Sequence, residues 1–319
     1  MSGPLQRAEN ASLRIAGPTA VGKSEVALLL AEQRGGEIIS VDSMQVYRGL
    51  DLGTAKPSPA ERARVPHHLI DVAGLSEAFD AARFLTLAHE AIEDIHRRGR
   101  LPILCGGTGL YFKALLQGLG ESPPADAKLR AELEQIPLNQ LLEELAARDP
   151  VTFERIDRRN PRRVVRALEV IRLTGRPYSE QRVGWSAEAA SAPAAAAPRV
   201  FALSREPADL RHRVDARVEV MFASGLVAEV ERLIPLGLAE NKTAMQAIGY
   251  RQVVEHLRGE RPLTDTIALV KQKTWQFAKR QMTWLRHQLP VQWVAIQPGE
   301  TAATVAARIT ALEQQASSH

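Results

Sequence analysis

The sequence predicts an α/β protein with a parallel sheet, helices on both faces of that sheet, and a small all-helical insertion. Three observations support this fold class. Short apolar runs alternate with helical patterns over the first 118 residues, as they do in βαβ units. Residues 126–180 carry helical patterns only, and an apolar run returns at 200–204. A glycine-rich motif at 17–24 lies between a strand pattern and a helix pattern, the usual setting of a phosphate-binding loop.

Four apolar runs in the first third of the chain are expected to be strands, at 13–16, 37–41, 68–72 and 101–105. Helical patterns predict helices at 23–33, 81–98 and 109–116. The turn-rich sequence GLGESPPAD follows and marks a boundary. We therefore expect the core to comprise residues 1–120 and 200–319, and the helical insertion domain to comprise 121–199.

The remaining segments complete this arrangement. Residues 186–198 form an Ala/Pro tract, which is typical of a loose connector. Residues 200–204 are expected to return to the sheet, 210–287 to be helical, and 291–296 to form a last strand.

Composition excludes several classes of protein. The 319 residues contain no apolar run near the roughly 18 residues that a membrane helix needs. The N-terminus lacks a basic start followed by an apolar stretch, so we expect no signal peptide. Cys105 is the only cysteine, which excludes internal disulfides and multi-cysteine zinc sites. We expect a cytoplasmic protein with no membrane association, and a monomer.

Positive charge is concentrated in two segments, although the net charge is only +4. Residues 155–176 contain eight arginines against two acids, and residues 270–287 contain five lysines and arginines with no acid. Such segments indicate a polyanionic partner, and two solvated helix faces are the alternative.

The motif at 17–24 supplies the first chemical assignment. Its residues are Gly17, Pro18, Thr19, Ala20, Val21, Gly22, Lys23 and Ser24, which match G-x-x-x-x-G-K-[ST]. The glycines let backbone N–H groups point inward, Lys23 supplies charge to phosphates, and the Ser24 hydroxyl can bind Mg²⁺. The loop predicts binding of a di- or triphosphate. Its chemistry fits either a kinase, with Asp42 or Asp71 as the second Mg²⁺ ligand, or an enzyme that holds a diphosphate leaving group.

Six further blocks resemble the tRNA dimethylallyltransferase family, and they occur in that family's order. They are SVDSMQVYR at 40–48, GTAKP at 53–57, PHHLID at 66–71, GGTGLY at 106–111, IGYRQ at 248–252 and AKRQMTWLR at 278–286. The resemblance implies a P-loop kinase-like fold with a helical insertion. It also implies transfer of a dimethylallyl group from dimethylallyl diphosphate to N6 of the adenosine 3′ of the anticodon, position 37, giving N6-dimethylallyladenosine and releasing diphosphate.

The resemblance implies roles for individual residues. Asp42 would be the general base on the adenine N6 amine, and Thr108 would donate a hydrogen bond to the bridging or leaving oxygen. The loop residues Gly17, Thr19, Ala20, Val21, Gly22, Lys23 and Ser24 would bind the diphosphate, with Mg²⁺ as cofactor on Ser24. The tRNA anticodon stem-loop would be the partner.

The implied tRNA-binding residues are distributed over the whole chain. They are Asp42, Ser43, Met44, Gln45, Thr108, Arg130, Arg162, Arg163, Arg166, Gln246, Gly249, Tyr250, Arg251, Lys279, Arg280, Gln281, Thr283, Trp284 and Arg286. Arginines hold phosphates bidentately and stack on unpaired bases, and single-stranded loops are the part of an RNA that proteins read most readily. Many members carry arginine where Gln246 stands, and Arg83 reverses the charge usual at its position.

Two other reaction classes fit the phosphate loop. An isopentenyltransferase that acts on free adenine nucleotides would not need the two basic segments. An ATP-dependent kinase would turn over ATP and carry an arginine-bearing lid near the loop.

Overall fold

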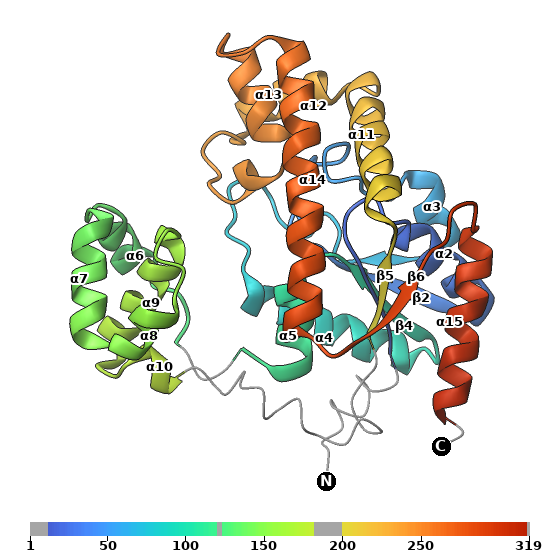
Figure 1. Ribbon diagram of the computed structural model, residues 1–319, viewed down its shortest axis with the longest axis horizontal. Helices are drawn as coiled ribbons and strands as arrows, with labels where there is room; N and C mark the ends of the chain where they lie inside the picture. Colours follow the sequence, from blue (N-terminus) through green and yellow to red (C-terminus); the bar gives the residue numbers. More distant parts are fainter. Residues whose placement is uncertain (1–11, 120–122, 182–199, 318–319) are drawn as a thin grey trace. The chain divides into compact units, whose positions relative to one another are not determined.

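The computed structural model describes residues 12–119, 123–181 and 200–317, and Figure 1 shows the arrangement of their elements. Contacts divide the chain into two compact units, Met1–Leu116 with Pro193–His319, and Gln117–Ala192. The first unit contains the sheet, and the second is helical. The predicted connector at 186–198 lies outside the described residues.

The first unit is built on a six-stranded, fully parallel sheet in the order β3-β2-β4-β1-β5-β6. The strands are β1 (Leu13–Ala16), β2 (Gly36–Val41), β3 (His67–His68), β4 (Leu101–Gly106), β5 (Val200–Ser204) and β6 (Val291–Ala295). Strands β1, β2 and β4 are adjacent, so their carboxyl ends meet at one edge.

Helices cover both faces of the sheet. Successive side chains of a strand point to opposite faces, so the strands contribute to two separate cores. Ile39 and Leu104 pack on one face with α4 (Ala81–Arg97) and α5 (Gly109–Gln117). Ile15 and Ile103 pack on the other face with α2 (Lys23–Arg34) and α15 (Ala302–Ser317). Figure 1 shows α2 and α15 together beside the sheet. The predicted α/β architecture with helices on both faces is confirmed.

The third predicted strand is wrong in its extent. It was expected over 68–72, but β3 ends at His68. Leu69 and Asp71 have φ values of 61° and 59°, in the left-handed region that extended strands avoid. The backbone turns there because Asp71 binds Lys56 and Arg62, at 2.5 and 2.9 Å.

The C-terminal helices complete the first unit. They are α11 (Pro207–Ala223), α12 (Leu226–Leu233), α13 (Tyr250–Leu257) and α14 (Leu263–Gln288), with short 3₁₀ turns at Ile234–Leu236 and Ala244–Gln246. In the N-terminal part of the same unit, a short helix α3 (Pro59–Arg64) precedes β3. Helix α14 is the longest, and its last turn joins α5 where Lys113 Nζ donates to Gln288 Oε1 (3.0 Å). Trp284 packs on one core and Trp275 on the other, so both anchor α14.

The second unit consists of α6 (Ala127–Glu134), α7 (Leu138–Arg148), α8 (Pro150–Arg155), α9 (Pro161–Thr174) and α10 (Tyr178–Gln181). A fully buried carboxylate, Glu169, joins its parts. It accepts the Asp126 N–H (2.9 Å) and binds Arg130 and Arg166, each at 2.7 Å. Arg166 also donates to the Pro123 carbonyl (2.6 Å). The start of the insertion is thus fastened to α9.

This network gives a stability prediction. We expect Glu169→Ala to destabilise the helical unit by about 2–3 kcal/mol, somewhat below the ~3–5 of a fully buried pair, because both guanidiniums are partly exposed. Native-state hydrogen exchange on the full chain should show faster exchange in α6 and α9 with the sheet unchanged. The exposed pair of Arg176 and Glu180 supplies the control, since Glu180→Ala should change exchange little.

Candidate active site and nucleic-acid interface

The candidate site lies at the carboxyl edge of three neighbouring strands. The phosphate loop, residues 17–24, follows β1; Asp42 follows β2; and Thr108 follows β4. Open parallel sheets bind their ligands at this edge. The predicted diphosphate and catalytic residues are therefore brought together.

The phosphate loop is preformed. Gly22 has a φ of 105° and Ala20, a residue with a side chain, has a φ of 65°, so the loop curls as the motif requires. Lys23 Nζ donates to the Pro18 carbonyl (3.2 Å). Burial lowers the pKa of Lys23 below its ordinary value of 10.5, and nearby Arg217 acts in the same direction. Ser24 is exposed at the first turn of α2.

Three arginines that the sequence analysis did not single out surround this loop. Arg205 Nε donates to the Val21 carbonyl (2.9 Å), and Arg213 Nε donates to the Ala20 carbonyl (3.0 Å). Arg217 Nη1 reaches Thr19 Oγ1 at 3.5 Å. Arg213 and Arg217 lie four residues apart on one face of α11, a spacing that could have signalled a shared target.

The arginines contact the loop through two of its backbone carbonyls and the Thr19 hydroxyl, and they add positive charge beside it. A hollow of about 230 Å³ beside Gly22 is lined by Arg205 and Arg213, among others. Burial lowers the pKa of Arg217, and the neighbouring Arg213 contributes. A diphosphate would neutralise this concentration of cations, so the loop is electrostatically suited to a polyanion.

Asp42 and Thr108 are linked through Ser43. Asp42 Oδ1 accepts the Met44 N–H (2.9 Å), which caps the turn after β2. The Ser43 N–H donates to Thr108 Oγ1 (3.1 Å), and the Thr108 N–H donates to the Val41 carbonyl (3.2 Å). Asp42 therefore has both an orienting contact and a place at the sheet edge.

Hydrogen bonds from polar side chains fix the segment after Asp42. Gln45 Nε2 donates to the carbonyls of Thr54 and Ala55, at 3.1 and 3.2 Å. Glu229, which is buried, accepts the N–H groups of Asp51 and Leu52 and the hydroxyl of Tyr250 (2.6 Å). These contacts position the segment 51–55 from the C-terminal helices.

Asp71 is held by two ion pairs, with Lys56 and Arg62. Burial opposes its ionisation, but hydrogen bonds from Lys56 and Arg62 outweigh burial and hold the pKa of Asp71 below its ordinary value. Both carboxylate oxygens are engaged by these cations.

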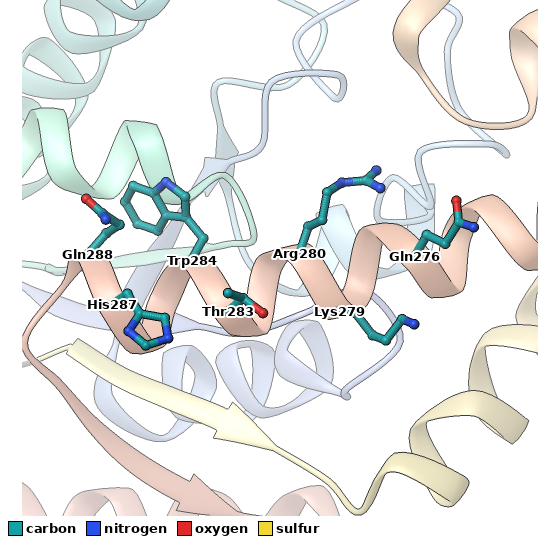
Figure 2. Close-up of a pocket in the computed structure, with 7 residues that line it drawn as sticks. All are labelled: Gln276, Lys279, Arg280, Thr283, Trp284, His287 and Gln288. Atoms are coloured by element: carbon teal, nitrogen blue, oxygen red, sulfur yellow. The ribbon is translucent and has the colours of Figure 1, made fainter. Parts of the chain in front are cut away.

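A groove of about 800 Å³ follows one face of α14. Its lining residues are Gln276, Lys279, Arg280, Thr283, Trp284, His287 and Gln288, and Figure 2 shows Trp284 and Arg280 projecting to the same side of the helix. Trp284 also covers the turn Gly106–Gly109: a side-chain carbon on Gly109 would lie 2.1 Å from its ring. The α14 groove thus reaches the turn that carries Thr108. Cations interleaved with an indole suit a nucleic acid.

Two residues assigned to tRNA contact lie in the interior. Tyr250 has no exposed surface, and its hydroxyl binds Glu229. Gln281 is 7% exposed, and its amide is hydrogen-bonded at both ends within the protein. Their burial does not match direct contact with an RNA.

The other predicted tRNA residues differ in their burial and in their partners. Arg130 and Arg166 are partly engaged by Glu169 inside the helical unit. Most of the others are exposed or half-buried: Asp42, Ser43, Met44, Gln45, Thr108, Arg162, Arg163, Gln246, Arg251, Lys279, Arg280, Thr283, Trp284 and Arg286. Gly249 is buried at the start of α13, where its φ of 103° requires glycine.

The protein side chains by themselves offer too few ligands for Mg²⁺, so the site fits this ion only when a diphosphate is bound beside Ser24. Within the described ranges, no three His, Cys, Asp or Glu side chains form a metal cluster. Ser24 offers one hydroxyl beside the phosphate loop, and Mg²⁺ commonly takes its remaining ligands from substrate phosphates and water.

Comparison with known proteins agrees with this geometry. The family model described as IPP transferase matches residues 45–288.

The chain belongs to the IPP transferase family.

Named relatives of the family are similar over most of the chain. A protein of Halorhodospira halophila named tRNA dimethylallyltransferase is 50% identical, covering 86% of this chain and 90% of the relative. One of Geotalea uraniireducens named tRNA dimethylallyltransferase 2 is 46% identical, covering 88% and 90%.

Solved structures agree with these sequence matches. The full-length tRNA isopentenylpyrophosphate transferase of Bacillus halodurans superposes with a TM-score of 0.68 at 37% identity, covering 97% of this chain and 98% of that one. A eukaryotic dimethylallyltransferase described as acting on tRNA gives 0.75 at 28% identity, covering 94% and 77%. The fold of this chain is therefore shared with solved structures described as tRNA isopentenylpyrophosphate transferase and as dimethylallyltransferase acting on tRNA. Across the described residues, the search for a helix able to cross a membrane finds none.

The cationic loop gives a pH prediction. Lys23 must be protonated to attract a diphosphate. Because its pKa is lowered, Lys23 loses its proton before the pH reaches its ordinary pKa of 10.5, so inorganic pyrophosphate should bind more weakly as the pH rises toward that value. Calorimetric titration measures this affinity. Lys23→Met should bind pyrophosphate weakly at every pH and lose the alkaline decline; a decline that persists in Lys23→Met would assign it to another group.

Proposed function

We propose that the protein transfers a dimethylallyl group from dimethylallyl diphosphate to N6 of adenosine 37, beside the anticodon of tRNAs. The N6–carbon bond forms as the bond between the allylic carbon and the bridging oxygen breaks. Diphosphate leaves, and the N6 proton passes to Asp42. The observation that carries this proposal is the shared sheet edge, on which the phosphate loop, Asp42 and Thr108 lie next to the end of the α14 groove.

Each group at this edge has a defined task in the proposed reaction. The loop N–H groups, Lys23 and Arg217 would stabilise charge that develops on the leaving diphosphate. Mg²⁺ on Ser24 would share that charge when bound. Asp42, oriented through its contact with Met44, would accept the proton from the amine. Thr108, whose oxygen accepts the Ser43 N–H, would donate a hydrogen bond from its hydroxyl to the leaving oxygen.

The α14 groove would receive the RNA. A target adenine must leave its stack to reach a catalytic residue, and Trp284 offers a ring at the boundary between groove and glycine turn. Lys279 and Arg280 would hold phosphates nearby.

Specific observations disfavour the other two reactions. Asp71, one candidate Mg²⁺ ligand of a kinase, is occupied by Lys56 and Arg62. The arginines near the phosphate loop sit at the end of β5 and on α11, a helix packed on α14, and not on a lid. An enzyme for free adenine nucleotides has no use for the α14 groove.

A single assay separates the three reactions. The protein is incubated with labelled dimethylallyl diphosphate and unmodified tRNA, AMP or ATP. We expect label in tRNA, at the adenosine next to the anticodon. Label in AMP but not in tRNA would replace this proposal with the free-nucleotide reaction, and ATP hydrolysis without transfer would favour a kinase.

Asp42→Asn tests the base. Asparagine keeps an oxygen that can accept the Met44 N–H but cannot take a proton, so turnover should fall by about 10²–10⁴ with tRNA affinity nearly unchanged. Single-turnover transfer measures the rate, and filter binding measures affinity. Asp80→Asn is the control, because Asp80 caps α4 in a comparable way. Equal rates in wild type and Asp42→Asn would remove Asp42 from the chemistry.

The groove residues are tested by salt dependence. Replacing Lys279 and Arg280 by alanine should weaken tRNA binding and reduce the slope of log affinity against log salt by about one to two. Lys273→Ala, exposed on the same helix but outside the groove, should change the slope less. The double variant Arg162→Ala with Arg163→Ala tests in the same way whether the helical unit binds tRNA phosphates. An unaltered slope in the first variant would place the RNA elsewhere.

A further inference from the structure

We propose that Gln281 is a positioning residue that fixes the phosphate loop against the glycine turn, Gly106–Gly109. Through this contact it would set the distance between the leaving diphosphate and the acceptor side of the site. The proposal rests on the proposed transfer reaction and assigns to Gln281 a role other than contact with RNA.

Both ends of the Gln281 amide are engaged, each with a different part of the site. Its Oε1 accepts the Thr19 N–H of the phosphate loop (2.9 Å). Its Nε2 donates to the Gly107 carbonyl of the glycine turn (2.9 Å). A primary amide supplies one acceptor and one donor at this spacing, whereas a carboxylate or a thioether supplies only part of that pair.

The contact continues to the catalytic residues. Gly107 precedes Thr108, and Thr108 Oγ1 accepts the Ser43 N–H next to Asp42. A displacement of the phosphate loop relative to the glycine turn therefore changes its distance from Asp42. Misplacement by about 1 Å can cost a hundredfold in rate.

The space around Gln281 is closed. Its side chain is 7% exposed, and a side-chain carbon on Gly107 would lie 2.3 Å from its Nε2. Glycine at 107 is thus what lets the amide reach the backbone carbonyl. The RNA groove is lined by other side chains of α14, shown in Figure 2, and does not include Gln281.

The loop keeps its other supports when Gln281 is replaced. Arg205 and Arg213 still hold the Val21 and Ala20 carbonyls, and the cations remain. Loss of the amide should therefore misplace the loop more than it weakens binding. This separates a positioning role from a binding role.

The first test is Gln281→Met in the full chain, which keeps the length of the side chain and removes both hydrogen bonds. We expect kcat to fall about tenfold to hundredfold, with less than threefold change in pyrophosphate affinity and in tRNA affinity. Hydrogen exchange of the Thr19 amide should become faster, because it loses its acceptor. Gln272→Met, exposed on the same helix, should match wild type in all four measurements.

A second variant breaks the same contact from the other side. In Gly107→Ala the new methyl group must push the flexible amide away, so kcat should fall while Gln281 is still present. We then combine Gly107→Ala with Gln281→Ala and compare kcat with that of each single variant. The fold-decrease in kcat of the double variant should be clearly smaller than the product of the two single decreases, because both changes break the same link between the phosphate loop and the glycine turn. Independent, multiplying losses would contradict the proposal.

Each remaining outcome has a distinct meaning. Unchanged kcat in folded Gln281→Met overturns the positioning role, and weakened tRNA binding with normal kcat makes Gln281 an RNA contact instead. Lost pyrophosphate affinity with normal saturating kcat makes it a binding residue. A wild-type protein that transfers no label refutes the transfer reaction and with it a positioning role in that reaction, whereas faster Thr19 exchange in Gln281→Met would still establish the contact.

Discussion

The site depends on the glycine turn, Gly106–Gly109, because the absence of side chains at its glycines lets β2 and α14 come close to its backbone. Side-chain carbons at Gly106, Gly107 and Gly109 would lie 2.0 Å from the Val41 carbonyl, 2.3 Å from the Gln281 amide and 2.1 Å from the Trp284 ring. Strand β2 and helix α14 therefore meet at one piece of backbone, and Gln281 connects the phosphate loop to it through the Thr19 N–H. Any larger residue there would separate parts that the reaction needs together.

The charges around the phosphate loop determine which kind of ligand it can bind. Cations reach the phosphate loop from within it, through Lys23, and from β5 and α11, through Arg205, Arg213 and Arg217. The acidic groups nearby have other partners: Glu229 organises the segment after Asp42, and Asp71 is held by Lys56. Positive charge is thus concentrated at the phosphate loop, and Asp42, which follows strand β2, is close enough to Lys23 to act on its pKa.

Local patterns predicted the elements well, because strand alternation and the P-loop spacing are properties of short segments. The strand at 13–16 and the loop at 17–24 were found this way. The arginines of α11, Arg213 and Arg217, were missed because their target is a loop nearly 200 residues away in sequence. Tertiary contacts are equally invisible in a local pattern. A run of arginines does not reveal that Arg166 binds a buried carboxylate, and the burial of Gln281 and Tyr250 follows only from the packing of α13 and α14.

The one cysteine has a practical consequence. Cys105 is buried behind the phosphate loop, with Sγ 3.7 Å from the Lys23 carbonyl, and burial raises its pKa to about 11. At neutral pH it is almost entirely an inert thiol. The natural chain is therefore equivalent to a cysteine-free background for labelling. A pair of introduced thiols, one on α14 and one on α9, would carry fluorophores or spin labels that report the separation of the two units while RNA binds.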